Sequence, residues 1–142
     1  LGAEEIGLVG GFEYVDQLSD SEIDRSVANF NMDMVGTAWE PATQLYVNVV
    51  DGQPNTVWEQ ADSAAQRLDN DILFLFERGA SDHVAFHEAG IDAANFIWRE
   101  PGTHDLEPWY HTPEDTIDNV SPEKIQQVGD LIDSAVSDLI LS

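Results

Sequence analysis

The sequence contains no cysteine and few basic residues, and each absence excludes a class of function. Without cysteine, the 142 residues form no disulfide, offer no thiolate nucleophile and have no cysteine-based metal site. Any metal must therefore be held by histidine and carboxylate side chains. Five Lys and Arg stand against 28 Asp and Glu, for a formal net charge of −23. Such a chain cannot form a phosphate-binding stripe, so we expect no nucleic-acid partner and no binding to an anionic membrane surface.

Long apolar runs are also missing. The longest, Ile72 to Phe76, falls far short of the ~20 residues that a membrane-spanning helix needs. No repeat, low-complexity tract or Pro/Gly-rich linker divides the chain. We therefore expect residues 1–142 to belong to a single globular domain.

The hydrophobic pattern predicts strands that alternate with helices. Strands are expected over 27–35, 45–50, 72–76 and 93–98, and helices over 6–18, 57–68 and 83–89. A last helix is predicted after Ser121 as N-cap, with Pro122 at its first position. This alternation favours an α/β three-layer sandwich, in which a mixed, mostly parallel sheet lies between helices. In such folds ligands bind at the carboxyl ends of strands.

Three acidic residues occupy such places. Glu4 and Glu5 stand side by side where a strand is expected to meet a helix, so their side chains diverge; one can bind a metal while the other holds a water. An acidic pair in a first helical turn also complements the helix dipole, and this alternative stays open. Asp33 ends an apolar strand, where a carboxylate is costly unless it is paired or bound to a cation. A role as a cap in the following turn is the alternative.

The four histidines differ in their surroundings. His83 and His87 are one helical turn apart, but no complete HExxH motif accompanies them, so a solvated helix face is expected. His104 lies in a polar loop and is expected to be exposed. His111 lies in WYHTPEDT, where the carboxylate of Asp115 can accept one imidazole N–H and leave the other nitrogen for a metal. A structural role for His111 is the alternative.

Serine hydrolysis is not supported by the sequence. There is no GxSxG motif, and the one Ser-Asp-His string, at 81–83, has its members adjacent, so that their side chains cannot converge as a triad. Phosphate-binding loops are absent as well.

Four motifs, in order, carry a family resemblance: GAEEIGLVGG, NFNMDMVG, GASDHVAFHEAGIDAANFI and EPWYHTPEDT. Together they resemble the C-terminal part of the co-catalytic two-zinc aminopeptidases, a family that includes secreted bacterial leucyl aminopeptidases and aminopeptidase Y. The resemblance covers nearly the whole chain. It implies an exopeptidase with two zinc ions that acts outside the cell on peptides with a free N-terminus.

The resemblance also implies a role for individual residues. Glu4 corresponds to the general base that acts on the attacking water, and Glu5 to a zinc ligand. His111 corresponds to a second ligand of the same zinc, and Asp33 to a ligand of the other one. Tyr110 matches an aromatic residue that helps to stabilise the tetrahedral intermediate.

Substrate selection follows from the same comparison. Met34, Ile97 and Tyr110 align with residues that line the pocket for the N-terminal side chain, and all are apolar or aromatic. A large hydrophobic N-terminal residue is therefore expected. Relatives often carry an arginine where this chain has Ala80, which implies weaker contacts to the far end of the substrate. The Ser-Asp-His string at 81–83 is expected to support the site without binding metal.

One departure concerns the metal ligands. Members of this family carry a His-x-Asp motif well upstream of the Glu-Glu pair, which supplies one histidine ligand and the aspartate that bridges both zincs. Neither occurs here, so we expect the chain to be the C-terminal portion of a single zinc-peptidase catalytic domain. Its sheet would lack N-terminal strands, and its partner would be the missing N-terminal segment of the same domain.

Two other functions are compatible with this fold. A glutaminyl-cyclase-like acyltransferase uses a single zinc and usually has Trp before the ligand histidine, whereas here Tyr110 holds that place and Trp109 precedes it. A binding module that has lost its metals is the second alternative. The presence of three acids and an imidazole at the expected ligand and base positions argues against it.

Overall fold

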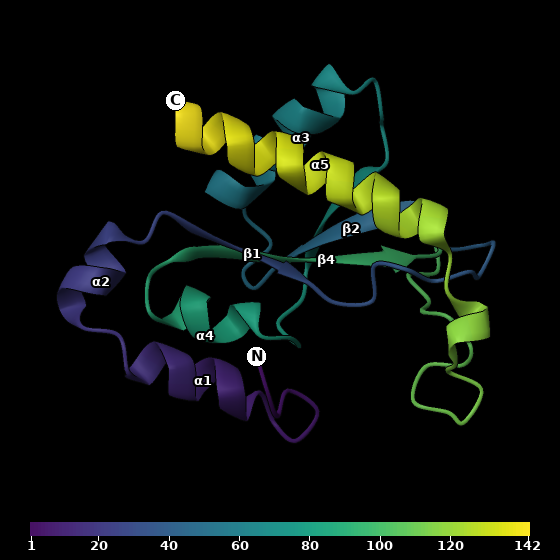
Figure 1. Cartoon of the computed structure of the whole chain (residues 1–142), viewed down its shortest axis with the longest axis horizontal. Helices are drawn as coiled ribbons and strands as arrows, with labels where there is room; N and C mark the ends of the chain where they lie inside the picture. Colours follow the sequence, from purple (N-terminus) through teal and green to yellow (C-terminus); the bar gives the residue numbers. More distant parts are fainter.

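A four-stranded sheet forms the middle of the molecule (Figure 1). The structure is a computed structural model that describes residues 1–142. In the order β1-β4-β2-β3, the strands are β1 (Ala28–Met32), β4 (Asp92–Arg99), β2 (Gln44–Val49) and β3 (Leu73–Glu77). The pairs β1/β4 and β2/β3 are parallel, and β2/β4 is antiparallel. The prediction of a mixed, mostly parallel sheet is confirmed.

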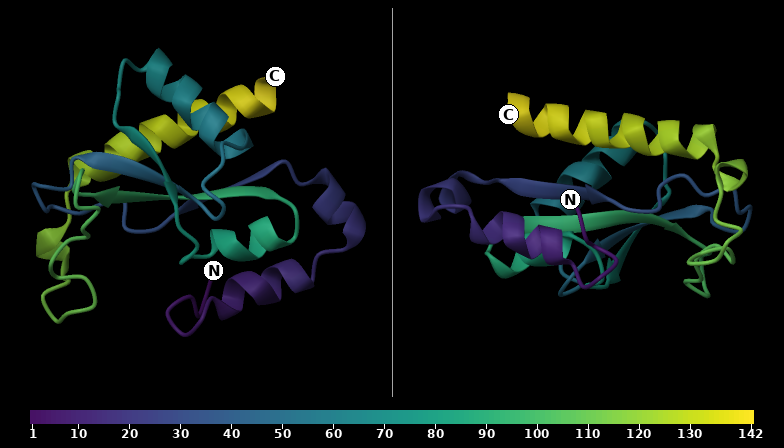
Figure 2. Two further views of the ribbon diagram at one scale, coloured as in Figure 1. Left: turned by 180° about the vertical axis from the view of Figure 1, so that it is seen from behind. Right: turned by 60° about the horizontal axis from the view of Figure 1, so that its bottom comes forward.

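Helices cover both faces of this sheet, as the three-layer prediction requires (Figures 1 and 2). On one face lie α3 (Thr56–Arg67) and α5 (Pro122–Leu141), and on the other α1 (Val9–Asp16) and α4 (His83–Glu88). The short α2 (Asp20–Arg25) connects α1 to β1, and the 3₁₀ turn η1 (Ile117–Asn119) precedes α5. None of these helices is both long and apolar enough to cross a bilayer.

The main core lies between the sheet and the pair α3/α5. Strand residues alternate between the two faces, and on β4 the members that point to this core are Ala94, Phe96 and Trp98. On α3, Ala61 and Ala64 are fully buried, and their small side chains let the helix lie close to the strands. The side chains of Asn95, Ile97 and Arg99 alternate with these and point to the other face of the sheet.

The only lysine of the chain joins α5 to this core. Lys124 Nζ donates hydrogen bonds to the carbonyl oxygens of Trp39 (3.0 Å) and Ala42 (2.7 Å). It also lies 5.3 Å from the ring centroid of Trp98, and the indole N–H of Trp98 donates to the Val35 carbonyl at 2.8 Å. Partial burial lowers the pKa of Lys124, an effect that the charge of Glu107 opposes. Lys124 thus links α5 to the loop at Trp39–Ala42 and to Trp98 of β4.

Several element boundaries differ from the prediction. The helix expected over 6–18 begins only at Val9, because Gly7 and Leu8 have positive φ angles of 111° and 60°. The strand expected over 27–35 ends at Met32. Helix α2 was missed, although Ser19 and Glu22 form a capping box that the sequence displays as S-x-x-E.

Two predictions about histidines were wrong. His83 does not lie on a solvated face: it is fully buried, and its Nε2 donates to the carbonyl of Arg78 at 3.0 Å. His104 is half-buried, because its ring packs against Tyr46, Phe74 and Phe76. For His104, aromatic contacts with residues distant in the sequence outweigh its polar neighbours.

Candidate active site

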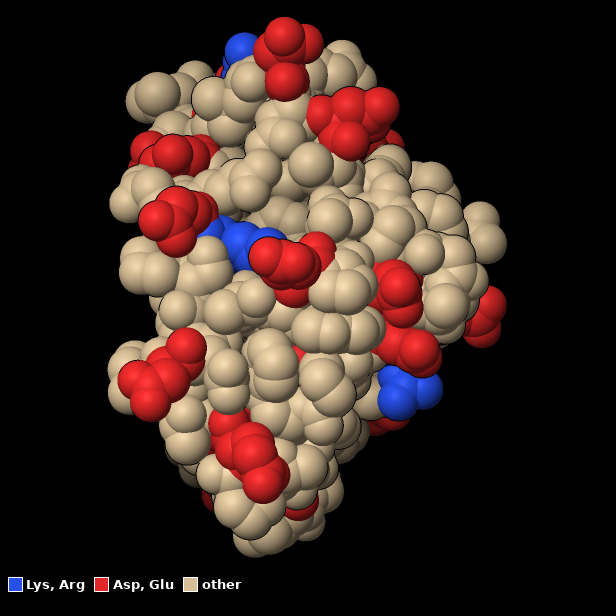
Figure 3. All heavy atoms as spheres, turned by 90° about the vertical axis from the view of Figure 1, so that its right-hand side faces the viewer, with Lys and Arg blue, Asp and Glu red and all other residues tan.

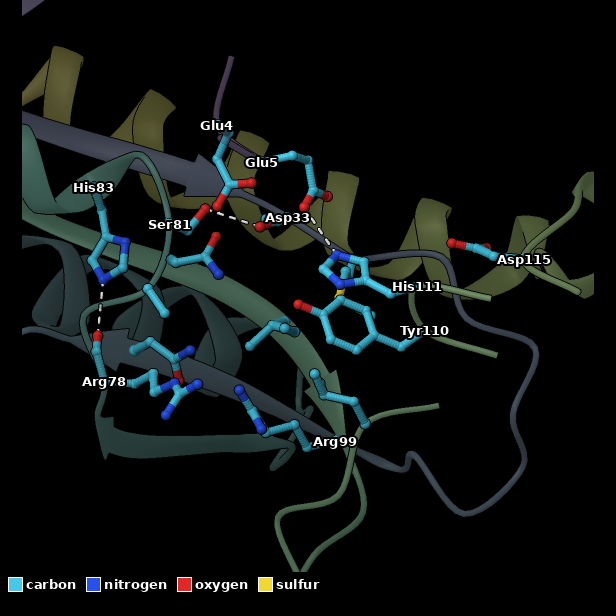
Figure 4. A pocket seen from close by; sticks show the side chains of 16 residues that line it. Glu4, Glu5, Asp33, Arg78, Ser81, His83, Arg99, Tyr110, His111 and Asp115 are labelled. Carbon is cyan, nitrogen blue, oxygen red and sulfur yellow. Dashed lines mark hydrogen bonds and ion pairs between the residues drawn. The ribbon is translucent and has the colours of Figure 1, made fainter. Parts of the chain in front are cut away.

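A cavity of about 320 Å³ lies on the face of the sheet opposite the main core, where Asn95, Ile97 and Arg99 of β4 line it. Asn48 and Asn95 line its floor, and they are paired neighbours on β2 and β4; Asn31 on β1 pairs with Asn95 in turn. Because they share a register position, their side chains share a face. Loops before α1, after β1, after β3 and after β4 form its walls (Figure 4). The cavity therefore collects side chains from widely separated parts of the chain.

Asp33, directly after β1, is fixed at this cavity by a chain of hydrogen bonds. Its backbone N–H donates to the Phe96 carbonyl at 3.2 Å, which continues the β1/β4 ladder. Ser81 Oγ donates to Asp33 Oδ2 at 2.9 Å, and Asn31 Nδ2 lies 3.0 Å from both Ser81 Oγ and Asn95 Oδ1. Ser81 is buried. The carboxylate is thus oriented by a serine from the supporting string at 81–83.

Glu4 and Glu5 lie in a tight turn that leads into α1. The Glu4 carbonyl accepts hydrogen bonds from the backbone N–H groups of Gly7 (3.1 Å) and Leu8 (2.8 Å). The two carboxylates point in different directions (Figure 4). Glu5 Oε2 lies 2.9 Å from His111 Nε2, whereas Glu4 is half-buried and faces Asp33 and Ser81. Glu5 and His111, 106 positions apart in the sequence, therefore meet in the cavity.

Backbone strain accompanies this meeting point. His111 and Met34 both have left-handed backbone angles, with φ of 56° and 65°. For residues other than glycine this costs about 1–3 kcal/mol and occurs mainly where the surroundings require it, often at functional sites. The ring of Tyr110 stacks on that of His111, with centroids 3.9 Å apart, and holds the imidazole toward Glu5.

Burial and the charges of nearby carboxylates raise the pKa of Glu4. Partial burial is the largest cause. The negative charges of Asp33, Glu5 and Asp82 contribute next, in that order, and His111 has a smaller opposite effect. A cation close to these acids would stabilise the charged form of Glu4. The electrostatics of the cavity therefore favour a bound positive ion.

The phenol of Tyr110 also has a raised pKa. Burial is the first cause, and the charges of Glu5, Asp33 and Glu4 follow. Arg78 acts in the opposite direction. Tyr110 therefore keeps its proton at neutral pH and can donate a hydrogen bond into the cavity.

The donor set fits zinc, which binds carboxylate oxygen and imidazole nitrogen. Glu5 and His111 are close enough to contact the same ion, and Asp33 lies in the same cavity. No group of three or more His, Asp or Glu side chains is close enough together to hold a metal ion by itself. Asp115 lines the cavity but makes no hydrogen bond to His111, whose Nε2 faces Glu5 instead.

Further lining residues divide into apolar and polar groups. Met34, Ile97 and Tyr110 all line the cavity, joined by Ala80 and Leu106. Sequence reasoning missed the polar group, which comprises Asn48, Arg78, Asn95 and Arg99. The alternation of β4 could have indicated two of them, since residues 95, 97 and 99 share a face.

The sequence matches the pattern of "Peptidase family M28" over residues 1–136. The chain belongs to peptidase family M28. Its M28 fold is similar to that of "BSAP, a zinc aminopeptidase from Bacillus subtilis", with a TM-score of 0.95 at 58% identity over 97% of this chain. It is also similar to "Aminopeptidase from Aneurinibacillus sp. strain AM-1", with a TM-score of 0.84 at 43% identity over 95% of this chain.

The M28 relatives are considerably longer than this chain. "Aminopeptidase YwaD" of Bacillus subtilis (strain 168) is 58% identical over 139 residues, which is 98% of this chain but 30% of that protein. The two structures above are covered over 34% and 31% of their lengths. The chain thus spans about a third of the M28 relatives that it matches.

Proposed function

We propose that this chain is the C-terminal portion of the catalytic domain of a zinc aminopeptidase that releases N-terminal residues from peptides. The observation that carries the proposal is the meeting of Glu4, Glu5, Asp33 and His111 in one cavity. The names of the relatives, a zinc aminopeptidase and two other aminopeptidases, support it. The remaining metal ligands would come from the part of the domain that the relatives have and this chain does not span.

Each residue of the cavity has a separate task in this proposal. Glu5 and His111 hold one zinc and Asp33, oriented by Ser81, holds the second. When bound, the metal supplies Lewis-acid chemistry and makes water more acidic. Glu4 takes the proton from the attacking water and gives it to the departing amine, a role to which its raised pKa is suited.

Tyr110 completes the reaction centre. Its protonated phenol donates a hydrogen bond to the carbonyl oxygen as negative charge develops there. Tyr110 also lines the pocket, together with Met34 and Ile97, for the N-terminal side chain. Their apolar surfaces favour a large hydrophobic residue such as leucine. We also propose that the enzyme acts outside the cell, as the secreted peptidases that it resembles do; detection in the culture medium would test this.

The two alternative functions receive less support. The three relatives named above are aminopeptidases, which favours the aminopeptidase function over the acyltransferase. A binding module without metals would have no physical reason to gather Glu4, Glu5, Asp33 and His111 in one cavity.

Hydrolysis of leucine p-nitroanilide by the full-length protein tests the proposal. We expect turnover that a chelator abolishes and that added zinc restores. Acetyl-leucine p-nitroanilide is the matched control, because acetylation converts the free amine to a neutral amide and leaves the leucyl anilide bond in place; it should not be cleaved. Equal cleavage of both substrates, or activity that survives metal removal, would contradict a zinc aminopeptidase.

A further inference from the structure

Two arginines line the cavity without a negatively charged partner. Arg78 follows β3, and Arg99 ends β4. Neither forms an ion pair, although acidic residues outnumber basic ones 28 to 5. Figure 3 shows one acidic face of the molecule, with carboxylates spread over it and only a few basic atoms. Two unpaired cations in one cavity are therefore unexpected in this protein.

The other three basic side chains all have partners. Arg67 pairs with Asp138 at 3.6 Å, and Arg25 Nε donates to the Ser21 carbonyl at 3.1 Å. Lys124 binds two carbonyl oxygens, as described above. Arg78 alone among the five basic side chains has no hydrogen bond or ion pair, and Arg99, next to it in the cavity, has a backbone acceptor but no carboxylate partner.

Arg99 is held in place but has unused donors. It is 9% exposed, and its Nη1 donates to the His104 carbonyl at 2.8 Å. Its guanidinium carbon lies 5.8 Å from the ring centroids of both Tyr46 and Phe76. Its Nε is buried without any hydrogen-bond partner. A guanidinium has five N–H donors, and a buried charge without a counter-ion is costly.

Arg78 adds a second positive charge at the same place. Burial lowers the pKa of Arg99, and the like charge of Arg78 lowers it further. The Arg78 side chain is exposed and makes no hydrogen bond. An anion between the two guanidinium groups would relieve this repulsion.

The cavity is therefore polarised. In Figure 4 the carboxylates of Glu4, Glu5 and Asp33 occupy one side, and Arg78 and Arg99 the other. A short peptide at neutral pH is a zwitterion, with an ammonium at one end and a carboxylate at the other. The two sides of the cavity match these two ends.

We propose, on the basis of the aminopeptidase function above, that Arg78 and Arg99 bind a carboxylate group of the peptide substrate. The α-carboxylate of a dipeptide fits this role, because Met34 and Ile97 already provide apolar surface for the N-terminal side chain. The enzyme would then favour dipeptides with a free C-terminus. The side-chain carboxylate of an N-terminal glutamate is a second source of the same chemistry, and the experiment separates the two.

The experiment compares four substrates on the full-length protein: Leu-Ala, Leu-Ala amide, leucine p-nitroanilide and glutamate p-nitroanilide. Arg78→Met is the main variant, since this exposed side chain makes no hydrogen bond that folding needs; Arg99→Met is the second. Charge-assisted hydrogen bonds of this kind correspond to about 10- to 100-fold in kcat/KM. We expect the ratio of kcat/KM for Leu-Ala to that for Leu-Ala amide to fall by that factor.

Arg25→Met is the matched control, because it removes the same charge on α2 and should leave the ratio as it is. If instead the ratio of glutamate to leucine p-nitroanilide falls, the carboxylate site stands and its ligand is the N-terminal side chain. Ratios that stay constant in the Arg78 and Arg99 variants would overturn the proposal. A wild-type protein that cleaves none of the four substrates would instead contradict the aminopeptidase function, and this proposal with it.

Discussion

The hydroxyl of Ser81 donates a 2.9 Å hydrogen bond to Oδ2 of Asp33, although the two residues lie 48 positions apart. Asn31 donates to Ser81 in turn, so the Asp33 carboxylate is oriented before any ligand arrives. Such partners of metal ligands typically contribute about 10- to 100-fold in metal affinity or activity.

Removing this hydroxyl should weaken one zinc site of the full-length protein. We expect Ser81→Ala to lower zinc affinity by about 10- to 100-fold, because Asp33 then loses its orienting donor. Ser63→Ala, on the exposed side of α3, is the control. Competition with a chromogenic chelator measures both. An affinity equal to that of the control would show that Ser81 does not position a ligand.

Substitutions of Glu4 and His111 should have different effects, the first on catalysis and the second on zinc binding. Glu4→Gln removes the proton acceptor and no proposed ligand, so turnover of leucine p-nitroanilide should fall by about 10²- to 10⁴-fold with the zinc content unchanged. His111→Ala should lose zinc itself. Metal analysis beside the kinetics decides between them, with Glu13→Gln on α1 as an exposed control. Wild-type turnover in Glu4→Gln would exclude it as the base.

The position of the Glu4-Glu5 turn depends on Gly10. A Cβ at Gly10 would overlap the carbonyl oxygen of Gly2 and lie 2.8 Å from its carbon, so Gly10→Ala should displace the turn and lower activity. Gly129→Ala in α5 is the matched control, since a Cβ added at Gly129 would have nothing within 4 Å. Gly129→Ala should raise the free energy of unfolding by about 0.5–1 kcal/mol, because alanine favours a helix more than glycine does. Thermal unfolding and a leucine anilide assay measure both effects. Full activity in Gly10→Ala would contradict the close contact.

Much of the fold follows from local pattern, and its exceptions have physical causes. The strands near β2, β3 and β4 and the helix after Ser121 were predicted because period-2 and period-3.6 patterns and an N-cap are local signals. The strand order could not be predicted, because pairing such as β1 with β4 joins residues about 60 positions apart. The turn at Gly7-Leu8 was missed because a positive φ at leucine leaves no mark in the pattern.

The site was predicted from motifs rather than from patterns. Glu4, Glu5, Asp33 and His111 were named from a family resemblance, and the structure places them around one cavity; their roles stay predictions. Arg78 and Arg99 were missed because nothing local distinguishes an unpaired arginine. The alternation of β4 indicates which face Arg99 lies on, but only its contacts with His104 and Tyr46 show that it has no carboxylate partner.

The isolated 142-residue chain should bind zinc weakly. Glu5 and His111 give two ligands for one ion, and Asp33 gives one for the other, whereas ordinary catalytic zinc sites have three protein ligands. We expect at most one weakly bound zinc and no significant peptidase activity. Equilibrium dialysis and a leucine anilide assay on the chain alone test this. Two tightly bound zincs with full turnover would mean that ligands have been overlooked within residues 1–142.

Anomalous diffraction at the zinc edge, from crystals of the full-length protein, tests the central assignment most directly. The account predicts one zinc peak in contact with the carboxylate of Glu5 and the imidazole of His111, and a second in contact with Asp33. Glu4 should approach the metals without binding either one. Zinc that is coordinated by other residues, or a Glu4 carboxylate in the inner coordination sphere, would contradict it.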